Sequence, residues 1–333
     1  MASLLRDAGY ATALVGKWHL GSLPNFGPLK SGYEEFFGHY QGAADYFRHG
    51  FRGRHDLWDG EQEVHMKGYL TDLFTERAVQ FISKQRGGRP FLLSLHYNAP
   101  HWPWETREDE AEANRIEDIA HLDGGSVRTY ATMIHHMDEG IGKVLDALDR
   151  IGARENTIVV FTGDNGGERF SDTYPLMGKK MDLLEGGIRV PCVIRWPARA
   201  PVGKQTSRLA MGMDWTPTFL AAAGVSAHRD YPLDGVDLFG EEVQRNLYWR
   251  MLFRNQRAVR SGTWKYLSVD GAEFLYDLSR DERERANMRY REPDRFKALR
   301  AAYFEWDASM PLFPEGARYA LEYRDDTMAR SSG

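Results

Sequence analysis

The feature that most constrains the fold is an amphipathic helix pattern followed at once by a strongly β-branched segment. Between residues 127 and 148, apolar side chains recur at intervals of three and four, and Gly152 follows as a C-terminal cap. The stripe comprises Tyr130, Met133, Ile134, Met137, Ile141, Val144, Leu145 and Leu148. Residues 157–162, Thr-Ile-Val-Val-Phe-Thr, then have the composition of a strand buried on both faces of a parallel sheet. This succession predicts the α/β class.

The same alternation runs through the first two thirds of the chain. Further strand patterns lie at residues 11–15, 91–97 and 190–196, and further helix patterns at residues 2–8, 71–86 and 214–223. We therefore expect an α/β sandwich around a mainly parallel central sheet. Residues 20–68 show no clear period and are expected to be loops. The acidic stretch from Glu105 to Asp118 is expected to be a solvated excursion.

The pattern changes after about residue 245. Short strand patterns at residues 247–252, 257–261, 263–268 and 273–278 precede a helix pattern at residues 293–306. Successive short strands predict a small antiparallel sheet with one helix packed on it. We therefore divide the chain into an α/β domain, residues 1–244, and a C-terminal α+β subdomain, residues 245–333.

Composition excludes several other classes of protein. The 333 residues carry 43 Lys and Arg against 48 Asp and Glu, a net charge of −5, which disfavours a nucleic-acid partner. The single cysteine, Cys192, excludes an internal disulfide and a cysteine-based zinc site. No apolar run approaches the roughly 18 residues of a transmembrane helix, so we expect no membrane partner. Charge already at Arg6 leads us to expect no signal peptide in this chain.

Polar residues that could carry chemistry follow predicted strands, at the edge where open α/β sheets bind ligands. Lys17 and His19 lie between glycines and offer a fixed cation and a titratable group, with a surface turn as the alternative. His101 lies between two prolines in a stiff segment, where it is either an acid or a packed loop histidine.

Asp164 and Asn165 follow the strand pattern at residues 157–162 and precede two glycines. Their oxygen atoms suit a hard cation such as Ca²⁺ or Mg²⁺, and the alternative is an ordinary Asx turn. Two ligands are too few for such an ion, so a complete site needs further carboxylates.

A second polar segment precedes the strand pattern at residues 190–196. Lys179 and Lys180 are placed to anchor an anionic group. Glu185 and Arg189 are expected to form a structural pair around the double glycine between them.

Taken in order, these segments resemble the sulfatase family of the alkaline-phosphatase-like superfamily. Residues 9–19, which end in Gly-Lys-Trp-His, match its second signature, and Asp164-Asn165-Gly matches its second metal-binding pair. Lys180, five residues before Glu-Gly-Gly, and His101 match its sulfate-binding Lys and His. Residues 276–278, Tyr-Asp-Leu, resemble part of its C-terminal sheet, so the resemblance covers roughly residues 2–290.

The resemblance implies a metal-dependent sulfuric ester hydrolase acting on a sulfate ester or sulfated glycan. Asp164 and Asn165 would help to hold a divalent ion, Ca²⁺ or alternatively Mg²⁺. The lysines Lys17 and Lys180 would neutralise charge on the sulfuryl group. His101 would protonate the leaving oxygen, and His19 would be the base that releases sulfate. Members of the family are often periplasmic, secreted or lysosomal.

The chain departs from the family pattern at the nucleophile. Family members carry Cys-x-Pro-x-Arg or Ser-x-Pro-x-Arg, whose first residue becomes formylglycine, and an Asp-Asp pair that completes the metal site. Cys192 has neither Pro nor Arg at those offsets, and Ser22 and Ser309 lack the Arg. We therefore expect an N-terminally truncated sulfatase with no nucleophile, inactive by itself. A phosphate or phosphonate monoesterase of the same superfamily and a non-catalytic remnant are the alternatives.

Overall fold

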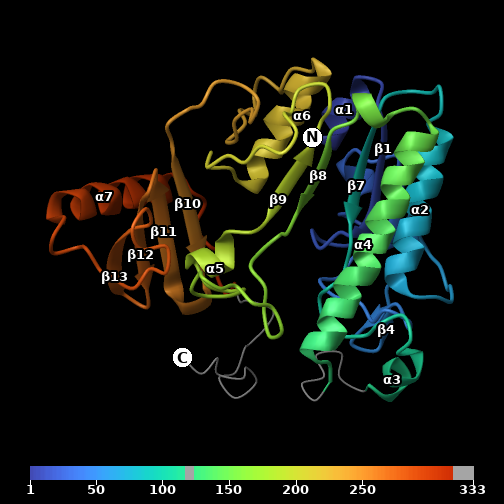
Figure 1. The fold of residues 1–333 in the computed structure, drawn as a ribbon, viewed down its shortest axis with the longest axis horizontal. Helices are drawn as coiled ribbons and strands as arrows, with labels where there is room; N and C mark the ends of the chain where they lie inside the picture. The colour runs from blue at the N-terminus through green and yellow to red at the C-terminus, as the bar shows by residue number, and fades with distance from the viewer. Residues whose placement is uncertain (117–123, 318–333) are drawn as a thin grey trace. The chain divides into compact units, whose positions relative to one another are not determined.

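The computed structural model describes residues 1–116 and 124–317 (Figure 1). By their packing the residues separate into two compact units. The first comprises residues 1–158, 195–203 and 215–237, and the second comprises residues 159–194, 204–214 and 238–333. The predicted boundary between residues 244 and 245 stays a prediction. No helix of the described ranges is both long enough and apolar enough to cross a bilayer.

The first unit is built on a five-stranded mixed sheet in the order β6-β5-β2-β1-β7. Its strands are β1 (Ala11–Lys17), β2 (Glu35–His39), β5 (Trp58–Asp59), β6 (Gln62–Glu63) and β7 (Phe91–His96). Central β1 pairs in parallel with both β2 and β7, whereas β5 and β6 add to the β2 edge in antiparallel fashion. Between β2 and β5 in the sequence, β3 (Gly50–Phe51) and β4 (Arg54–His55) form a small antiparallel hairpin. The predicted α/β class is confirmed.

Helices cover this sheet in layers. The unit contains α1 (Ala2–Asp7), α2 (Leu70–Lys84), α3 (Glu110–Arg115), α4 (Val127–Arg150), α6 (Trp215–Ala223) and the short 3-10 helices η1 (Leu29–Ser31) and η2 (Arg154–Asn156). Helix α2 packs on β1, β2 and β7, and α4 packs along α2 (Figure 1). Ser126 caps α4, because its hydroxyl accepts a bond of 3.0 Å from the backbone N–H of Thr129. The helix predicted over residues 127–148 is therefore confirmed.

Two expectations about this unit hold only in part. Residues 20–68 are not only loops, since they contain β2 and the four short strands β3 to β6. Consecutive Phe36 and Phe37 are both buried in β2, so no polar alternation marks the strand. Glu105, in the supposedly solvated stretch, is fully buried, and Ala113 of α3 is buried as well. Residues 117 and 118 of that stretch lie outside the described residues.

The second unit contains two separate sheets. Strands β8 (Val159–Thr162) and β9 (Cys192–Arg195) pair only with each other in the described ranges. Phe161 of β8 is 42% exposed, so the expectation that residues 157–162 are buried on both faces was wrong. In the neighbouring β9, Val193 is 62% exposed. Within the described ranges neither strand is paired along its other edge, so their side chains are less covered by neighbouring strands than those inside a larger sheet. The unit also holds α5 (Glu185–Ile188) and the 3-10 helices η3 (Gly212–Asp214) and η4 (Phe253–Asn255).

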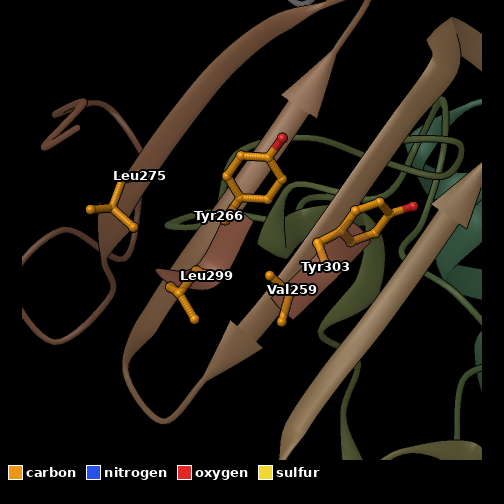
Figure 2. Close-up of a cluster of buried hydrophobic side chains, with 5 residues drawn as sticks. All are labelled: Val259, Tyr266, Leu275, Leu299 and Tyr303. Atoms are coloured by element: carbon orange, nitrogen blue, oxygen red, sulfur yellow. The ribbon is translucent and has the colours of Figure 1, made fainter. Parts of the chain in front are cut away.

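The C-terminal sheet is antiparallel in the order β10-β11-β12-β13, as predicted. Its strands are β10 (Asn246–Met251), β11 (Gln256–Ser261), β12 (Trp264–Val269) and β13 (Ala272–Asp277), and α7 (Pro293–Ser309) packs on β11 and β12. Figure 2 shows the buried cluster that joins helix and sheet: Val259, Tyr266, Leu275, Leu299 and Tyr303. Apolar burial of this kind contributes about 25 cal/mol per Å², which accounts for the docking of α7.

Candidate active site

The three parallel strands of the first unit end in polar side chains at one edge of the sheet. β1 ends at Lys17, β2 at His39 and β7 at His96. The Nδ1 of His96 donates to the carbonyl oxygen of Lys17 over 3.0 Å, and the N–H of Trp18 donates to the carbonyl of His39 over 2.9 Å. These bonds hold the strand ends together at the carboxyl edge, where α/β sheets bind ligands.

Gly16 lets these strands approach closely. Its φ is +114°, and an added Cβ would lie 1.9 Å from the carbonyl oxygen of His96. A Cβ at Gly38 of β2 would likewise lie 1.9 Å from the carbonyl oxygen of Gly16. Only glycine fits at both positions, which is why the Gly-Lys pair stands at this strand end.

His39 also lies at this edge of the sheet, and the sequence analysis did not select it. It is fully buried, and its Nδ1 donates to the carbonyl oxygen of Gln41 over 2.9 Å. Burial, reinforced by the charge of Lys17, lowers the pKa of His39 to about 3. The edge therefore presents a neutral imidazole beside a lysine. The signal for His39 is its position after Gly38 at the end of a strand, and that strand lies in the region without a visible period.

His19 lies just beyond the same strand end. Its φ of +54° places it in the left-handed region, and its N–H donates to the carbonyl oxygen of Tyr40 over 3.1 Å. The ring lies over Gly42, where an added Cβ would be 2.5 Å from Cε1. Lys17 and His19 both contribute to lowering the pKa of His39, so the structure brings these three residues to one edge.

His101 lies in the turn after β7. Its N–H donates to the carbonyl of Asn98 over 2.9 Å, and its own carbonyl accepts a bond of 2.9 Å from the Tyr46 hydroxyl. The ring donates from Nδ1 to the carbonyl oxygen of Trp102 over 2.9 Å. This bond fixes the ring and makes Nε2 the atom that can exchange a proton.

Glu105, four residues further on, is the second residue that the sequence analysis missed. Burial, followed by the charge of Asp45, raises its pKa to about 8. Tyr46 connects it to His101, because the Tyr46 N–H donates to Glu105 Oε2 over 3.2 Å while the hydroxyl bonds the His101 carbonyl. A buried carboxyl group with a raised pKa is therefore connected through Tyr46 to the His101 turn.

The second unit brings Asp164, Asn165 and Lys180 onto two adjoining loops. The N–H of Gly166 donates to the carbonyl of Gly187 over 2.8 Å, and the N–H of Lys180 donates to the carbonyl of Gly167 over 2.9 Å. A Cβ at Gly166 would lie 1.9 Å from the carbonyl oxygen of residue 186, so glycine is required there. The residues predicted in the first unit, Lys17, His19 and His101, lie in a separate unit from these three.

Asp164 and Asn165 fit part of an oxygen-ligated cation site. The Asn165 Nδ2 donates to the carbonyl of Gly166 over 2.8 Å, which turns Oδ1 to the opposite side, and Asp164 is exposed. Two oxygen donors suit a hard cation but are fewer than the roughly six to eight that Ca²⁺ takes. Within the described residues, neither belongs to a cluster of three or more His, Cys, Asp or Glu side chains.

Lys180 has a carboxylate partner that the sequence did not reveal. Its Nζ lies 3.1 Å from Glu168 Oε2, and the two side chains are only 17% and 15% exposed. The pair keeps the ammonium group in place on the loop. An anion that binds Lys180 must therefore compete with Glu168 or displace it.

The expected pair of Glu185 with Arg189 was wrong. The Glu185 carboxylate instead binds Lys265 over 3.0 Å and Arg260 over 2.8 Å, both from the C-terminal sheet. Lys265 is fully buried and also lies 2.9 Å from Glu284. These partners are 75 and 80 residues away in the chain, beyond what local spacing can predict.

Gln256 of β11 adds a second connection between that sheet and the Lys180 loop. Its Oε1 accepts from the N–H of Leu183 over 2.9 Å, and its Nε2 donates to the carbonyl of Met181 over 2.7 Å. Met181 follows Lys180 directly and has a φ of +75°. The C-terminal sheet thus fixes the backbone of the loop that presents Lys180.

Each unit therefore presents a lysine where an anion can bind: Lys17 at the carboxyl edge of a parallel sheet, and Lys180 beside a glycine-rich loop. The chain belongs to the sulfatase family, whose profile matches residues 1–225. The resemblance predicted from the sequence is confirmed.

Several sulfatases are similar in sequence to this region. The chain is 32% identical over 274 residues to N-acetylgalactosamine-6-sulfatase of Canis lupus familiaris, which covers 76% of this chain and 50% of the relative. It is 32% identical over 251 residues to arylsulfatase J of Mus musculus, covering 71% and 40% of the two chains. The chain spans about half the length of the curated relatives it matches.

Solved structures show the same fold. Ps i-CgsB has a TM-score of 0.81 and 28% identity, covering 92% of this chain and 73% of that one. The structure of BT4656 in complex with D-glucosamine-2-N,6-O-disulfate has a TM-score of 0.71 and 19% identity, covering 92% and 81%, a likeness of fold. The expected alkaline-phosphatase-like architecture is therefore confirmed.

Proposed function

We propose that this chain provides the sulfate-binding and proton-transfer residues of a formylglycine-type sulfuric ester hydrolase. The observation that carries the proposal is the junction of the Asp164–Gly167 loop with Lys180 in a chain of the sulfatase family. At that junction the side chains of Asp164 and Asn165 and the ammonium group of Lys180 belong to adjoining backbone segments. Such an arrangement can hold a sulfate group from two sides.

The two lysines would neutralise the charge of the sulfuryl group. Lys17 is fixed at the end of β1 and Lys180 by its backbone bond to Gly167. The positive charge of each ammonium group would stabilise the negative charge that develops on the sulfuryl oxygens in the transition state.

Two groups outside the described atoms would complete the chemistry. A divalent cation held by Asp164 and Asn165, Ca²⁺ or alternatively Mg²⁺, would polarise the sulfate oxygens. A formylglycine would supply the attacking oxygen, and none of the 333 residues stands in the motif that becomes one. We therefore propose that the chain by itself does not turn over sulfate esters.

The histidines would handle protons. His101, fixed by its Nδ1 bond to the Trp102 carbonyl, would donate from Nε2 to the leaving oxygen. His19 would act as the base that allows sulfate to leave. The buried, protonated Glu105 would keep negative charge away from the His101 turn.

Sulfated glycans are the substrate class that the relatives favour. One relative is named for the 6-sulfate of N-acetylgalactosamine, and Ps i-CgsB, at 29% identity, has been solved in complex with k-i-k-neocarrahexaose. We propose a sulfate ester on a sugar hydroxyl as the substrate. A sugar oxygen is a poor leaving group, which gives His101 an acid role to play.

The test uses an extended chain, in which a segment carrying an Asp-Asp pair and Cys-x-Pro-x-Arg precedes Met1 and is matured by coexpression. Lys180→Ala and Asp164→Ala should each lower kcat/KM for an aryl sulfate about a hundredfold or more, on the order of 3 kcal/mol. The neighbouring Lys179→Ala is the matched control and should have little effect. Equal losses for Lys179→Ala and Lys180→Ala would contradict the assigned role of Lys180.

The role of His101 has its own readout. His101→Ala should slow esters of poor leaving groups more than it slows an activated aryl sulfate, because a weakly basic oxygen needs little protonation. Equal losses for both ester types would remove His101 from the acid role.

A further inference from the structure

A compact cluster of possible metal ligands lies in the first unit and includes none of the residues assigned above. One ligand atom each of His55, Glu63 and His65 lies within 4.8 Å of the other two. Among residues 1–116 and 124–317 this is the one cluster of three such side chains. The hydrolysis proposed above gives these residues no role.

The backbone explains why the three side chains meet. Glu63 ends β6, and His65 follows two residues later, so both side chains point to the same side of an extended segment. A hydrogen bond of 2.9 Å from the N–H of the intervening Val64 to the carbonyl of Leu57 holds this segment in place. His55, at the end of β4, donates from Nε2 to the carbonyl of Val64 over 2.8 Å.

The distances come close to those of a metal site. His65 Nε2 lies 3.3 Å from Glu63 Oε1. Ligand atoms at about 2.0–2.1 Å from a tetrahedral Zn²⁺ are about 3.4 Å apart, so this pair already has the required separation. The rings of His55 and His65 are stacked with centroids 4.1 Å apart. The His65 side chain is 75% exposed, so it can turn its lone pair toward a shared ion without disturbing the core.

The surroundings of His55 supply the outer support that metal-binding histidines need. Its two ring nitrogens face the carbonyl oxygens of Val64, at 2.8 Å, and Arg48, at 3.2 Å. For one nitrogen to bind a metal, its contact with a carbonyl oxygen must open, and the longer contact with Arg48 is the easier one to open. The other nitrogen then keeps its carbonyl acceptor, which fixes the ring and its tautomer.

We propose that His55, Glu63 and His65 bind one transition-metal ion of borderline softness, and we take Zn²⁺ as the reference metal. Two imidazoles and one carboxylate favour Zn²⁺, Ni²⁺ or Cu²⁺ over Ca²⁺, which prefers oxygen ligands throughout. Three protein ligands leave a fourth position open to water or to an anionic group. This site differs in residues and in metal preference from the Asp164–Asn165 pair.

The test is a titration of the tag-free 333-residue chain with Zn²⁺ against a chromophoric chelator, together with the Co²⁺ absorption spectrum. The chain should bind one equivalent, and His65→Ala and Glu63→Gln should each raise Kd at least about tenfold. Millimolar Ca²⁺ should not compete. Both changes are at exposed positions, and circular dichroism should show the fold unchanged.

The matched control is His135→Ala. His135 is 69% exposed and lies 3.6 Å from Glu139, so it is a surface His–Glu pair that belongs to no cluster of three. Its replacement should leave Kd unchanged. The proposal is overturned if no equivalent of Zn²⁺ binds, if His65→Ala and Glu63→Gln bind like the unaltered chain, or if His135→Ala weakens binding equally.

Discussion

Replacing Lys265 with methionine should destabilise the second unit strongly. Lys265 is fully buried between the carboxylates of Glu185 and Glu284, at 3.0 and 2.9 Å. Removing one partner of a buried ion pair costs about 3–5 kcal/mol because the remaining charge loses its compensation. Two carboxylates lose a partner here, so Lys265→Met should lie at the upper end of that range. Lys297→Met, on the exposed face of α7, should cost less than about 0.5 kcal/mol.

The loss of unfolding free energy caused by Lys265→Met should increase with pH. Burial already raises the pKa of Glu284, and Lys265 is the strongest influence that lowers it. Without Lys265 the folded-state pKa rises further above the unfolded value. A carboxyl group of this kind contributes its stability below the unfolded pKa and loses it as the pH rises through the folded pKa. The destabilisation by Lys265→Met should therefore be smaller at pH 5 than at pH 8.

Urea unfolding followed by tryptophan fluorescence measures both effects, since Trp249 and Trp264 lie in the C-terminal sheet. A double change, Lys265→Met with Glu284→Leu, should recover part of the loss because it removes one of the uncompensated charges. A cost below 1 kcal/mol at both pH values, matching Lys297→Met, would refute the reasoning.

Three further outcomes follow from individual residues. Because the pKa of Glu105 is raised to about 8, its contribution to stability should fall as the pH rises from about 4.5 to 8. Glu105→Gln should flatten this part of the pH profile of urea unfolding, whereas the control Glu108→Gln, at an exposed position, should not. Gly16→Ala should lower Tm far more than Gly9→Ala. Both glycines have a positive φ, but only at Gly16 would the added Cβ lie 1.9 Å from a carbonyl oxygen; equal shifts in Tm would contradict this. Calorimetry of the 333-residue chain should show no micromolar Ca²⁺ binding, because Asp164 and its neighbour supply two of the six to eight ligands needed; a micromolar Kd would contradict the incomplete site.

Much of the fold could be predicted because its strongest signals are local. The stripe over residues 127–148 and the turn-separated strands after residue 245 depend on spacing within one element. Strand β2 could not be predicted in this way. Phe36 and Phe37 are buried on opposite faces by neighbours distant in the sequence, so tertiary pairing and not periodicity defines that strand.

The same distinction between local and long-range signals applies to the candidate site. The positions of Lys17 and Asp164 at the ends of strands were predictable, because both follow recognisable strand patterns and lie near glycines. His39 was not, because its low pKa comes from burial and from the charge of Lys17, which only the folded sheet brings near. The partners of Glu185 come from the C-terminal sheet, so local spacing suggested Arg189 instead.

The central claim is that these residues serve a sulfate monoester hydrolase, and the most direct test compares two esters of one aryl alcohol. The matured extended chain should hydrolyse the aryl sulfate with a kcat/KM well above that for the aryl phosphate. Replacing the nucleophile Cys of the added segment with Ala should abolish turnover of both esters. Preferential turnover of the phosphate, lost in the same Cys→Ala control, would contradict the claim and assign the chain to the phosphate monoesterases of the superfamily.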